Sequence, residues 1–256
     1  MTCGGEAMIV YDLNADWPQP EPLDVLAIAA HPDDVEQTCG GALIRMAGLG
    51  YRTGALDLTA GDMGTRGTPE TRMEESAAAG DCLMLAWRGN RRFPDARLEN
   101  TLSVRMTLAG DIRRLRPRVV ILPYWDARHP DHYRACEIGF EACFLAGIRK
   151  LDPYTEPHRP YKVIYSSLYA NVTPSFVVDI TAQFDRRMDA LLCYRSQYGE
   201  SVEGSDLFPR EQEIRGRLAG IARFYGNLIG VKYGEPYVVK ETMRVDDLIS
   251  LGVRSF

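Results

Sequence analysis

Apolar runs and amphipathic segments alternate along the chain from Leu23 onward. Residues 23–30 (LDVLAIAA) are almost continuously apolar, which is typical of a strand buried on both faces of a sheet. Residues 35–50 have apolar side chains at helical spacing and end in glycine, which predicts one helix closed by Gly50. The alternation continues, with strands expected at 51–59, 87–91, 117–125, 161–167 and 175–180, and helices expected at 71–86, 102–116, 181–198 and 207–230.

This order of elements predicts an α/β fold. Neighbouring parallel strands need crossover connections, and helices between consecutive strands supply them. We therefore expect a Rossmann-like, doubly wound and mostly parallel sheet with helices on both faces. Residues 1–22 include two adjacent glycines and the proline-rich WPQPEP, and we expect them to form a flexible leader. Residues 23–256 contain no repeat or linker, so they are expected to form a single domain.

Composition and charge narrow the possible partners. The chain has 256 residues, 45% hydrophobic and 25% charged, with a formal net charge of −5. It has no block of basic residues, which argues against a nucleic-acid partner. It also has neither a bilayer-length apolar stretch nor a signal-peptide pattern, so no membrane partner is expected. Six cysteines are scattered without a CxxC pair, which favours reduced thiols and a cytoplasmic location.

Polar residues follow three of the expected strands. HPDD follows the first strand, GDMGTRGTPETR follows the second, and ARHPDH follows VVILPYW. Ligands of doubly wound sheets bind at the carboxyl ends of the strands. We therefore expect these three segments to meet at one edge of the sheet and to form the functional site.

Three of these residues suit a metal ion. His31, Asp34 and His132 offer the nitrogen and oxygen donors that zinc accepts, and three protein ligands leave a fourth position open for catalysis. A cation would also offset the repulsion between the adjacent carboxylates of Asp33 and Asp34. The same donor types also bind iron. A simpler alternative is that the aspartates only cap the following helix.

Three further residues are candidates for catalysis. Asp33 is free to accept a proton from a water molecule that zinc has made acidic. His129 can polarise a substrate carbonyl or protonate a leaving amine. Asp131 can hold the His129 ring in the required tautomer.

AHPDD after the first strand and RHPDH near the end of another together resemble the PIG-L/LmbE-like zinc N-deacetylases. GDMGTRGTPETRMEE, HRPYKVIYS, TPSFVVDIT, YRSQYG and ARFYGNLIGVKYGEPY are similar to the branch that deacetylates an intermediate of bacillithiol biosynthesis. The resemblance begins near Leu23 and extends to the C-terminus.

This resemblance implies a zinc-dependent hydrolase that removes the acetyl group of N-acetylglucosaminyl-malate. It assigns zinc to His31, Asp34 and His132, and makes Asp33 the general base. It also implies that Arg72, assisted by Arg66, binds the carboxylate of the malate aglycone. A homo-oligomer is expected, and a hexamer is suspected.

Several alternatives remain open. Arg72 can instead be a solvated helix charge paired with Glu74 or Glu75. Tyr194 and Gln197 can line the substrate pocket or simply belong to a helix surface. The substrate can be another N-acetylglucosamine conjugate, such as an inositol conjugate or a chitooligosaccharide. Two histidines and one carboxylate also form the facial triad of non-haem iron oxygenases. A non-catalytic sugar-binding module is a further possibility.

Overall fold

The computed structural model describes residues 7–167, 170–199 and 210–253. Its strands form a sheet in the order β1-β4-β3-β2-β5-β6-β8-β7. The strands β1 to β6 run parallel to one another, whereas β8 is antiparallel to both of its neighbours, β6 and β7. The strands are β1 Val10–Asp12, β2 Val25–Ala29, β3 Thr53–Thr59, β4 Trp87–Phe93, β5 Val119–Pro123, β6 Lys162–Ser166, β7 Phe176–Asp179 and β8 Gly234–Val238.

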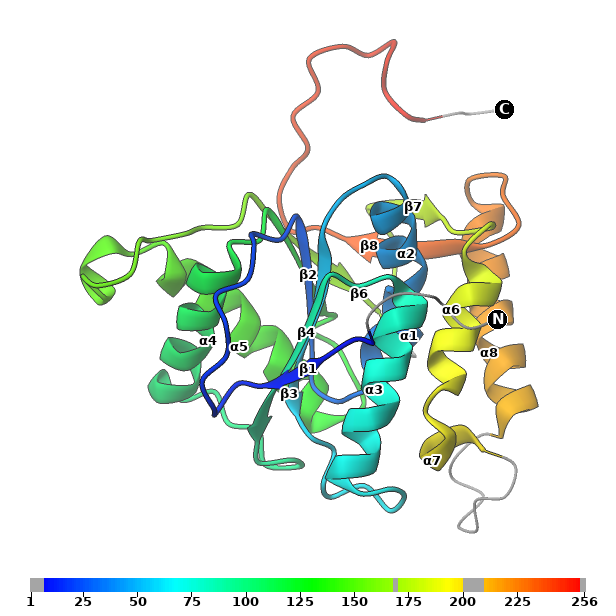
Figure 1. Ribbon diagram of the computed structural model, residues 1–256. Coiled ribbons are helices and arrows are strands. Elements are labelled where there is room, and N and C mark those ends of the chain that lie inside the picture. The colour runs from blue at the N-terminus through cyan, green and yellow to red at the C-terminus, as the bar shows by residue number, and fades with distance from the viewer. Residues whose placement is uncertain (1–6, 168–169, 200–209, 254–256) are drawn as a thin grey trace.

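Helices cover both faces of this sheet (Figure 1). Helices α4 and α5 lie on one face, and α1, α2, α3 and α6 lie on the other. The helices are α1 Asp34–Thr38, α2 Gly40–Gly48, α3 Pro69–Leu83, α4 Leu102–Leu115, α5 Pro130–Ala146, α6 Phe184–Leu192, α7 Arg195–Tyr198 and α8 Glu211–Asn227, with a 3-10 turn at Arg149–Leu151. The expected doubly wound, mostly parallel α/β fold is thereby confirmed.

The central strand β2 explains why both faces need helices. Successive side chains of a strand point to opposite faces. Leu26 and Ile28 pack into the core beneath α4 and α5, while Val25, Ala27 and Ala29 pack into the core beneath α2. All five side chains are buried. The continuous apolar run therefore reflects burial on both sides, as expected for a central parallel strand.

The N-terminal segment differs from the expected flexible leader. Strand β1 pairs in parallel with β4, with Tyr11 opposite Gly89. Leu13 and Trp17 are buried in the main core, and the Trp17 ring stacks beneath the guanidinium of Arg114. The prediction is therefore wrong for residues 10–17, because anchoring side chains outweigh the surrounding glycine and proline. Residues 1–6 lie outside the described part of the chain.

The helix expected at 35–50 is divided in two at Cys39, where the backbone leaves helical geometry with φ −140°. The carboxylate of Glu235 on β8 explains the break. It accepts hydrogen bonds from the backbone N–H groups of Gly41 (2.8 Å) and Ala42 (2.7 Å) at the start of α2. A buried acid thus binds the free N–H groups that an uninterrupted helix would not offer.

None of the helices in the described residues is both long enough and apolar enough to cross a membrane.

Candidate active site

Three strand ends bring the candidate residues to one edge of the sheet. His31 follows β2, Asp95 follows β4, and the segment from His129 to His132 begins α5 after β5. The rings of His31 and His129 have centroids 4.8 Å apart, and those of His31 and His132 are 5.3 Å apart. Segments separated by about a hundred residues therefore meet at the carboxyl ends of the strands, as the sequence predicted.

His31, Asp34 and His132 point their donor atoms toward one another. His31 Nδ1 lies 3.3 Å from His132 Nε2 and 3.4 Å from Asp34 Oδ2. His132 Nε2 lies 3.2 Å from Asp34 Oδ1. Ligands held tetrahedrally about 2.0–2.2 Å from zinc are about 3.3–3.6 Å apart from one another. The two histidine nitrogens therefore have the spacing of two ligands of one zinc-sized ion, and each of them lies near a different oxygen of the Asp34 carboxylate.

The other ring nitrogen of His31 faces two carboxylates. Nε2 lies 3.0 Å from Asp95 Oδ1 and 3.4 Å from Asp131 Oδ2. His31, Asp95 and Asp131 also lie close enough to count as a possible metal cluster. We interpret the two acids as orienting groups instead, because a carboxylate behind a ligand histidine fixes its tautomer and raises its basicity.

The electrostatics of this cluster demand a positive charge. Burial alone would lower the pKa of His31, but hydrogen bonds to Asp131, Asp34 and Asp95 hold it well above its ordinary value. Burial alone would raise the pKa of Asp34, but His132 and His31 hold it well below its ordinary value. Either a proton on His31 or a bound cation would supply the positive charge that the neighbouring carboxylates stabilise. The charges around the cluster therefore favour a metal ion.

His129 is exposed beside the cluster, and its contacts define its tautomer. Its Nδ1 accepts a hydrogen bond from the backbone N–H of Asp131 at 3.2 Å. Burial, together with His31 and His132, lowers the pKa of His129. The neutral ring therefore has its proton on Nε2, where it can be donated to a developing oxyanion.

Asp131 does not orient His129 through its side chain, contrary to our expectation. Its carboxylate accepts hydrogen bonds from the backbone N–H groups of Ala96 (2.7 Å) and Leu98 (3.2 Å), and it faces His31. Asp131 therefore ties the loop after β4 to the cluster. Only its backbone N–H contacts the His129 ring.

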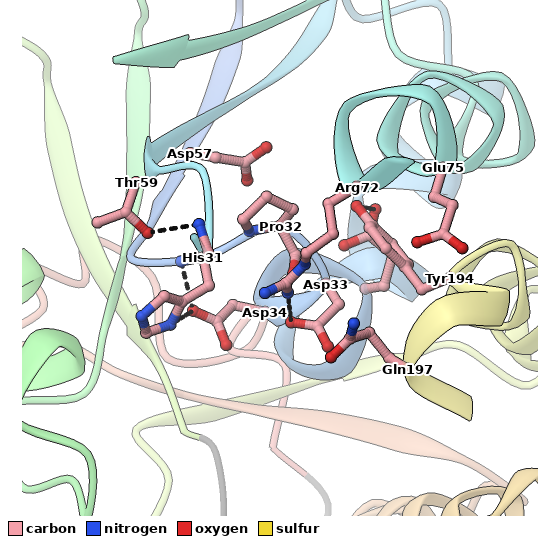
Figure 2. A network of polar contacts seen from close by, with 12 residues as sticks. His31, Pro32, Asp33, Asp34, Asp57, Thr59, Arg72, Glu75, Tyr194 and Gln197 are labelled. Carbon is pink, nitrogen blue, oxygen red and sulfur yellow. Dashed lines mark hydrogen bonds and ion pairs between the residues drawn. The ribbon is translucent and has the colours of Figure 1, made fainter. Parts of the chain in front are cut away.

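Asp33 lies beside the cluster, with its carboxylate directed toward Arg72 and Gln197 (Figure 2). Tyr198 donates a hydrogen bond to Oδ2 at 2.7 Å, and an Arg72 nitrogen lies 3.4 Å from Oδ1. Burial raises the pKa of Asp33 to about 6, despite the lowering effect of Arg72. Its backbone has φ 99°, a conformation that is strained for a residue with a side chain. A strained, buried carboxyl with a raised pKa has the properties of a general base.

Arg72 is placed differently from the expected aglycone contact. Its guanidinium is buried, donates to the carbonyl of Pro32 and pairs with Asp33. The alternative pairing with Glu75 is not observed either, because Glu75 accepts hydrogen bonds from Ser196 instead. Arg72 thus contacts Asp33 in this structure, and its role in binding an aglycone stays a prediction.

Arg66 and Gln197 bind each other. Arg66 donates to the carbonyl of Gln197 at 2.9 Å, and the Gln197 amide donates to the carbonyl of Arg66 at 2.8 Å. This reciprocal pair joins the loop after β3 to α7. A substrate role for Arg66 and Gln197 stays a prediction.

Tyr194 does not line the pocket. It is fully buried, and its hydroxyl accepts a hydrogen bond from Arg88 (2.9 Å) and donates to Glu36 (3.3 Å). Arg88 also pairs with Asp57, so these side chains form a buried ionic network behind Asp33. The prediction that Tyr194 contacts substrate is wrong because its polar end is used within this network.

Sequence reasoning missed two side chains that contact the candidates directly. Asp95 follows the end of β4, and a strand-end search extended to that strand would have found it. Tyr198 is the donor to Asp33, and YRSQY alone offers no signal for which tyrosine reaches the site. Tyr194 directly precedes α7 and contacts Arg88, whereas Tyr198 ends α7 and contacts Asp33.

Two cavities of the molecule differ in their volume and in their distance from the candidate residues. One cavity, of about 610 Å³, is lined mostly by apolar residues around β6 and the C-terminal segment and includes none of the candidate residues. A much smaller cavity, about 20 Å³, lies beside Asp34 and His132 and is otherwise lined by residues such as Ala27, Val35 and Ile121. This small cavity borders two of the metal-binding candidates, Asp34 and His132.

Comparisons with known proteins agree with this geometry. The family model described as PIG-L, GlcNAc-PI de-N-acetylase, matches residues 26–143. The diacetylchitobiose deacetylase of Thermococcus kodakarensis is 28% identical over 238 residues, which cover 88% of this chain and 85% of that protein. The uncharacterised deacetylase YaiS of Escherichia coli is 34% identical over 125 residues, 46% of this chain and 67% of that protein.

Two solved structures show how widely the fold is used. The conserved protein TT1542 of Thermus thermophilus is 40% identical, with a TM-score of 0.79 over 88% of this chain and 98% of that chain. GalB of Pseudomonas putida, a 4-carboxy-2-hydroxymuconate hydratase, is 20% identical, with a TM-score of 0.73 over 88% of this chain and 98% of that chain. The second likeness concerns the fold alone, so the reaction must be argued from the site. The family match covers β2 through most of α5, the segment that contains all three metal-binding candidates and Asp33, and this chain belongs to the PIG-L de-N-acetylase family.

Proposed function

We propose that the protein is a zinc-dependent N-deacetylase that hydrolyses the acetamide of a small N-acetylglucosamine conjugate, most specifically N-acetylglucosaminyl-malate. The observation that carries this proposal is the mutual spacing of His31, Asp34 and His132, with Asp33 adjacent in the chain but outside the cluster. A family of de-N-acetylases and a diacetylchitobiose deacetylase among the relatives support the reaction class.

The residues divide the work of amide hydrolysis among them. His31, Asp34 and His132 would hold zinc, which supplies Lewis acidity toward a water molecule and the amide carbonyl. Asp33 accepts the proton of the attacking water and later passes it to the departing amine. The Nε2–H of His129 donates to the oxyanion of the tetrahedral intermediate. Arg72 and Tyr198 hold the Asp33 carboxylate in place.

The small cavity beside Asp34 and His132 favours an acetyl group. Its volume of about 20 Å³ and largely apolar lining suit one methyl-sized group. N-propionyl and N-butyryl analogues of the substrate should therefore lose kcat/KM progressively. Equal rates for acetyl and butyryl analogues would contradict this use of the cavity.

Two exposed arginines support an acidic aglycone. Arg97 lies in the loop that contains Asp95, and Arg128 directly precedes His129. Within the described parts of the chain, neither forms an ion pair. Replacement of Arg128 by Gln should lower kcat/KM for N-acetylglucosaminyl-malate more than for the neutral diacetylchitobiose. Equal losses for both substrates would exclude recognition of a carboxylate by Arg128.

The direct test measures acetate release. Metal-free protein is reloaded with zinc or with ferrous iron and assayed on N-acetylglucosaminyl-malate, diacetylchitobiose and an N-acetylglucosaminyl-inositol. We expect release from the malate conjugate with zinc, loss of activity with a chelator, and wild-type activity for the surface control Asp185→Asn. Substrate binding without acetate release would favour a sugar-binding module, and oxygen consumption with iron would favour an oxygenase. The homo-oligomer, suspected to be a hexamer, and the cytoplasmic location stay predictions.

A further inference from the structure

Two cysteines that are distant in the chain come together outside the active site. Cys82 lies in the last turn of α3, and Cys193 directly follows α6. Their sulfur atoms are 3.8 Å apart, although 111 residues separate them. Helices α3 and α6 pack against each other, so the main body of the fold maintains this proximity.

These two cysteines differ from the other cysteines of the described residues. Cys39, Cys136 and Cys143 are buried, whereas Cys82 and Cys193 are partly exposed. Burial raises the pKa of the Cys136 and Cys143 thiols to about 12, which makes them unreactive near neutral pH. The pair is therefore the part of this set that small reagents in solution can reach.

The surroundings of the pair give its two members different roles. A hydrogen bond from Cys193 and the positive charge of Arg186 lower the pKa of Cys82 to about 7, although burial opposes them. Arg186 also donates to the backbone carbonyl of Cys82 at 2.6 Å, which keeps its charge nearby. The same sulfur contact and burial raise the pKa of Cys193. This asymmetry is typical of an attacking thiolate beside a resolving thiol.

We propose that Cys82 and Cys193 are a redox modification site that forms a reversible disulfide by exchange with small-molecule disulfides. The Cys82 thiolate attacks one sulfur of the disulfide, releases one thiolate and forms a mixed disulfide. Cys193 then attacks the Cys82 sulfur, gives up its proton and releases the second small thiol. The two protein thiols are oxidised together, and one small disulfide is reduced to two thiols.

The disulfide would act on the active site through the elements it joins. Helix α3 contains Cys82 and Arg72, and the segment after α6 contains Cys193 and Tyr198. Arg72 and Tyr198 are the two side chains described above that hold Asp33. Forming the bond brings the sulfurs from 3.8 Å to about 2.05 Å. This closure draws the C-terminal end of α3 and the segment after α6 together, and a displacement of either support of the general base slows catalysis.

Peptide mapping tests the chemistry without any assay of activity. Reduced protein with Cys3→Ser, a position outside the described residues, is incubated with 2-hydroxyethyl disulfide and digested without reduction. We expect a linked peptide that contains Cys82 and Cys193, together with loss of two titratable thiols. Cys193→Ser should stop at a mixed disulfide on Cys82, and Cys82→Ser should react at least tenfold more slowly. Protein that ends with separate adducts, or without reaction at Cys82, would overturn the proposal.

The effect on catalysis is measured on the same samples, and this arm alone rests on the proposed deacetylase function. The cross-linked protein should release acetate at least tenfold more slowly, and a dithiol reductant should restore the rate. The Cys82→Ser and Cys193→Ser variants should release acetate at the rate of the reduced wild-type protein, both after treatment with the disulfide and after treatment with the reductant. Their melting temperatures check that they fold. A fully cross-linked protein with unchanged kcat would disprove the coupling to Asp33, whatever its substrate proves to be.

Discussion

The two sides of the Asp33–Asp34 pair provide the clearest contrast in the molecule. On one side, Asp34 faces His31 and His132, which hold its pKa well below the ordinary value. On the other side, Asp33 is buried against Arg72 and Tyr198, and burial raises its pKa to about 6. Behind the Asp33 side, Arg88 pairs with two further carboxylates that have no contact with solvent.

This contrast shows how adjacent acids can have different tasks. The backbone at Asp33 is strained, with φ 99°, and the two consecutive side chains contact different partners. Asp34 stays ionised and is suited to bind a cation, while Asp33 can exchange a proton near neutral pH. Environments that separate the pKa values of two acids are a common basis for acid and base roles in one site.

The largest expected effect on activity comes from replacing Asp33 and Asp34 by asparagine in two separate variants. Asp33→Asn should lower kcat by about 10²–10⁴-fold, because the base is lost, while the metal content stays at the wild-type level. Asp34→Asn should lose metal as well as activity, because it removes a ligand. Metal analysis and acetate release on both variants measure the difference. If Asp33→Asn also lost its metal, the division of tasks between the two acids would be wrong.

The buried arginine network should dominate stability instead of catalysis. Arg88→Met leaves the carboxylates of Glu36 and Asp57 buried without their partner, which should cost about 3–5 kcal/mol in the free energy of unfolding. The control Arg118→Met removes a solvent-exposed pair with Asp24 and should cost about 1 kcal/mol or less. Urea unfolding measures both changes. Similar values for the two variants would contradict the proposed importance of burial.

The orienting acid behind His31 should have an intermediate effect. Asp95→Asn weakens the contact of 3.0 Å to His31 Nε2 and should reduce zinc affinity about 10–100-fold. Competition with a zinc-binding dye gives the affinity directly. If the affinity stayed within twofold of the wild type, Asp95 would have no role in holding the metal.

The alternation of apolar runs and helical segments predicted most of the sheet, since burial on both faces leaves a continuous apolar signal. It did not predict β1, because Val10–Asp12 is short and only partly buried and is held mainly by its pairing with β4 and by Trp17 nearby. It also did not predict the antiparallel place of β8 between β6 and β7. Both features depend on tertiary contacts that local pattern does not encode.

The candidate site shows the same limit. The strand-end rule predicted that His31, Asp34 and His132 would meet, and the structure places them together. It could not show that Asp131 faces His31, or that Tyr198 and not Tyr194 reaches Asp33. Those choices depend on side-chain direction around a short helix and a loop, which tertiary packing decides.

Replacing Arg72 should shift the pH dependence of the reaction. Asp33 acts as a base only when deprotonated, so kcat/KM falls as the pH drops through its pKa. Arg72 lowers this pKa, so Arg72→Met should raise it and move the acidic limb to higher pH by about 1 unit or more. A pH–rate profile of the zinc-loaded enzyme measures the shift. A limb that moved to lower pH would contradict the pairing of Arg72 with Asp33.

Replacing Tyr198 should also move the acidic limb of the pH–rate profile to higher pH, and this is the smallest effect that we expect. Its hydroxyl stabilises the ionised form of Asp33 through one hydrogen bond, and this effect on the pKa is weaker than that of the Arg72 charge. Tyr198→Phe removes the bond but keeps the ring, so the acidic limb should move to higher pH by less than in Arg72→Met, with KM nearly unchanged. Tyr194→Phe is the matched control, because Tyr194 bonds to Arg88 and Glu36 instead of Asp33 and should leave the limb in place. A larger shift for Tyr194→Phe than for Tyr198→Phe would mean that the buried network, and not the direct donors, sets the pKa of Asp33.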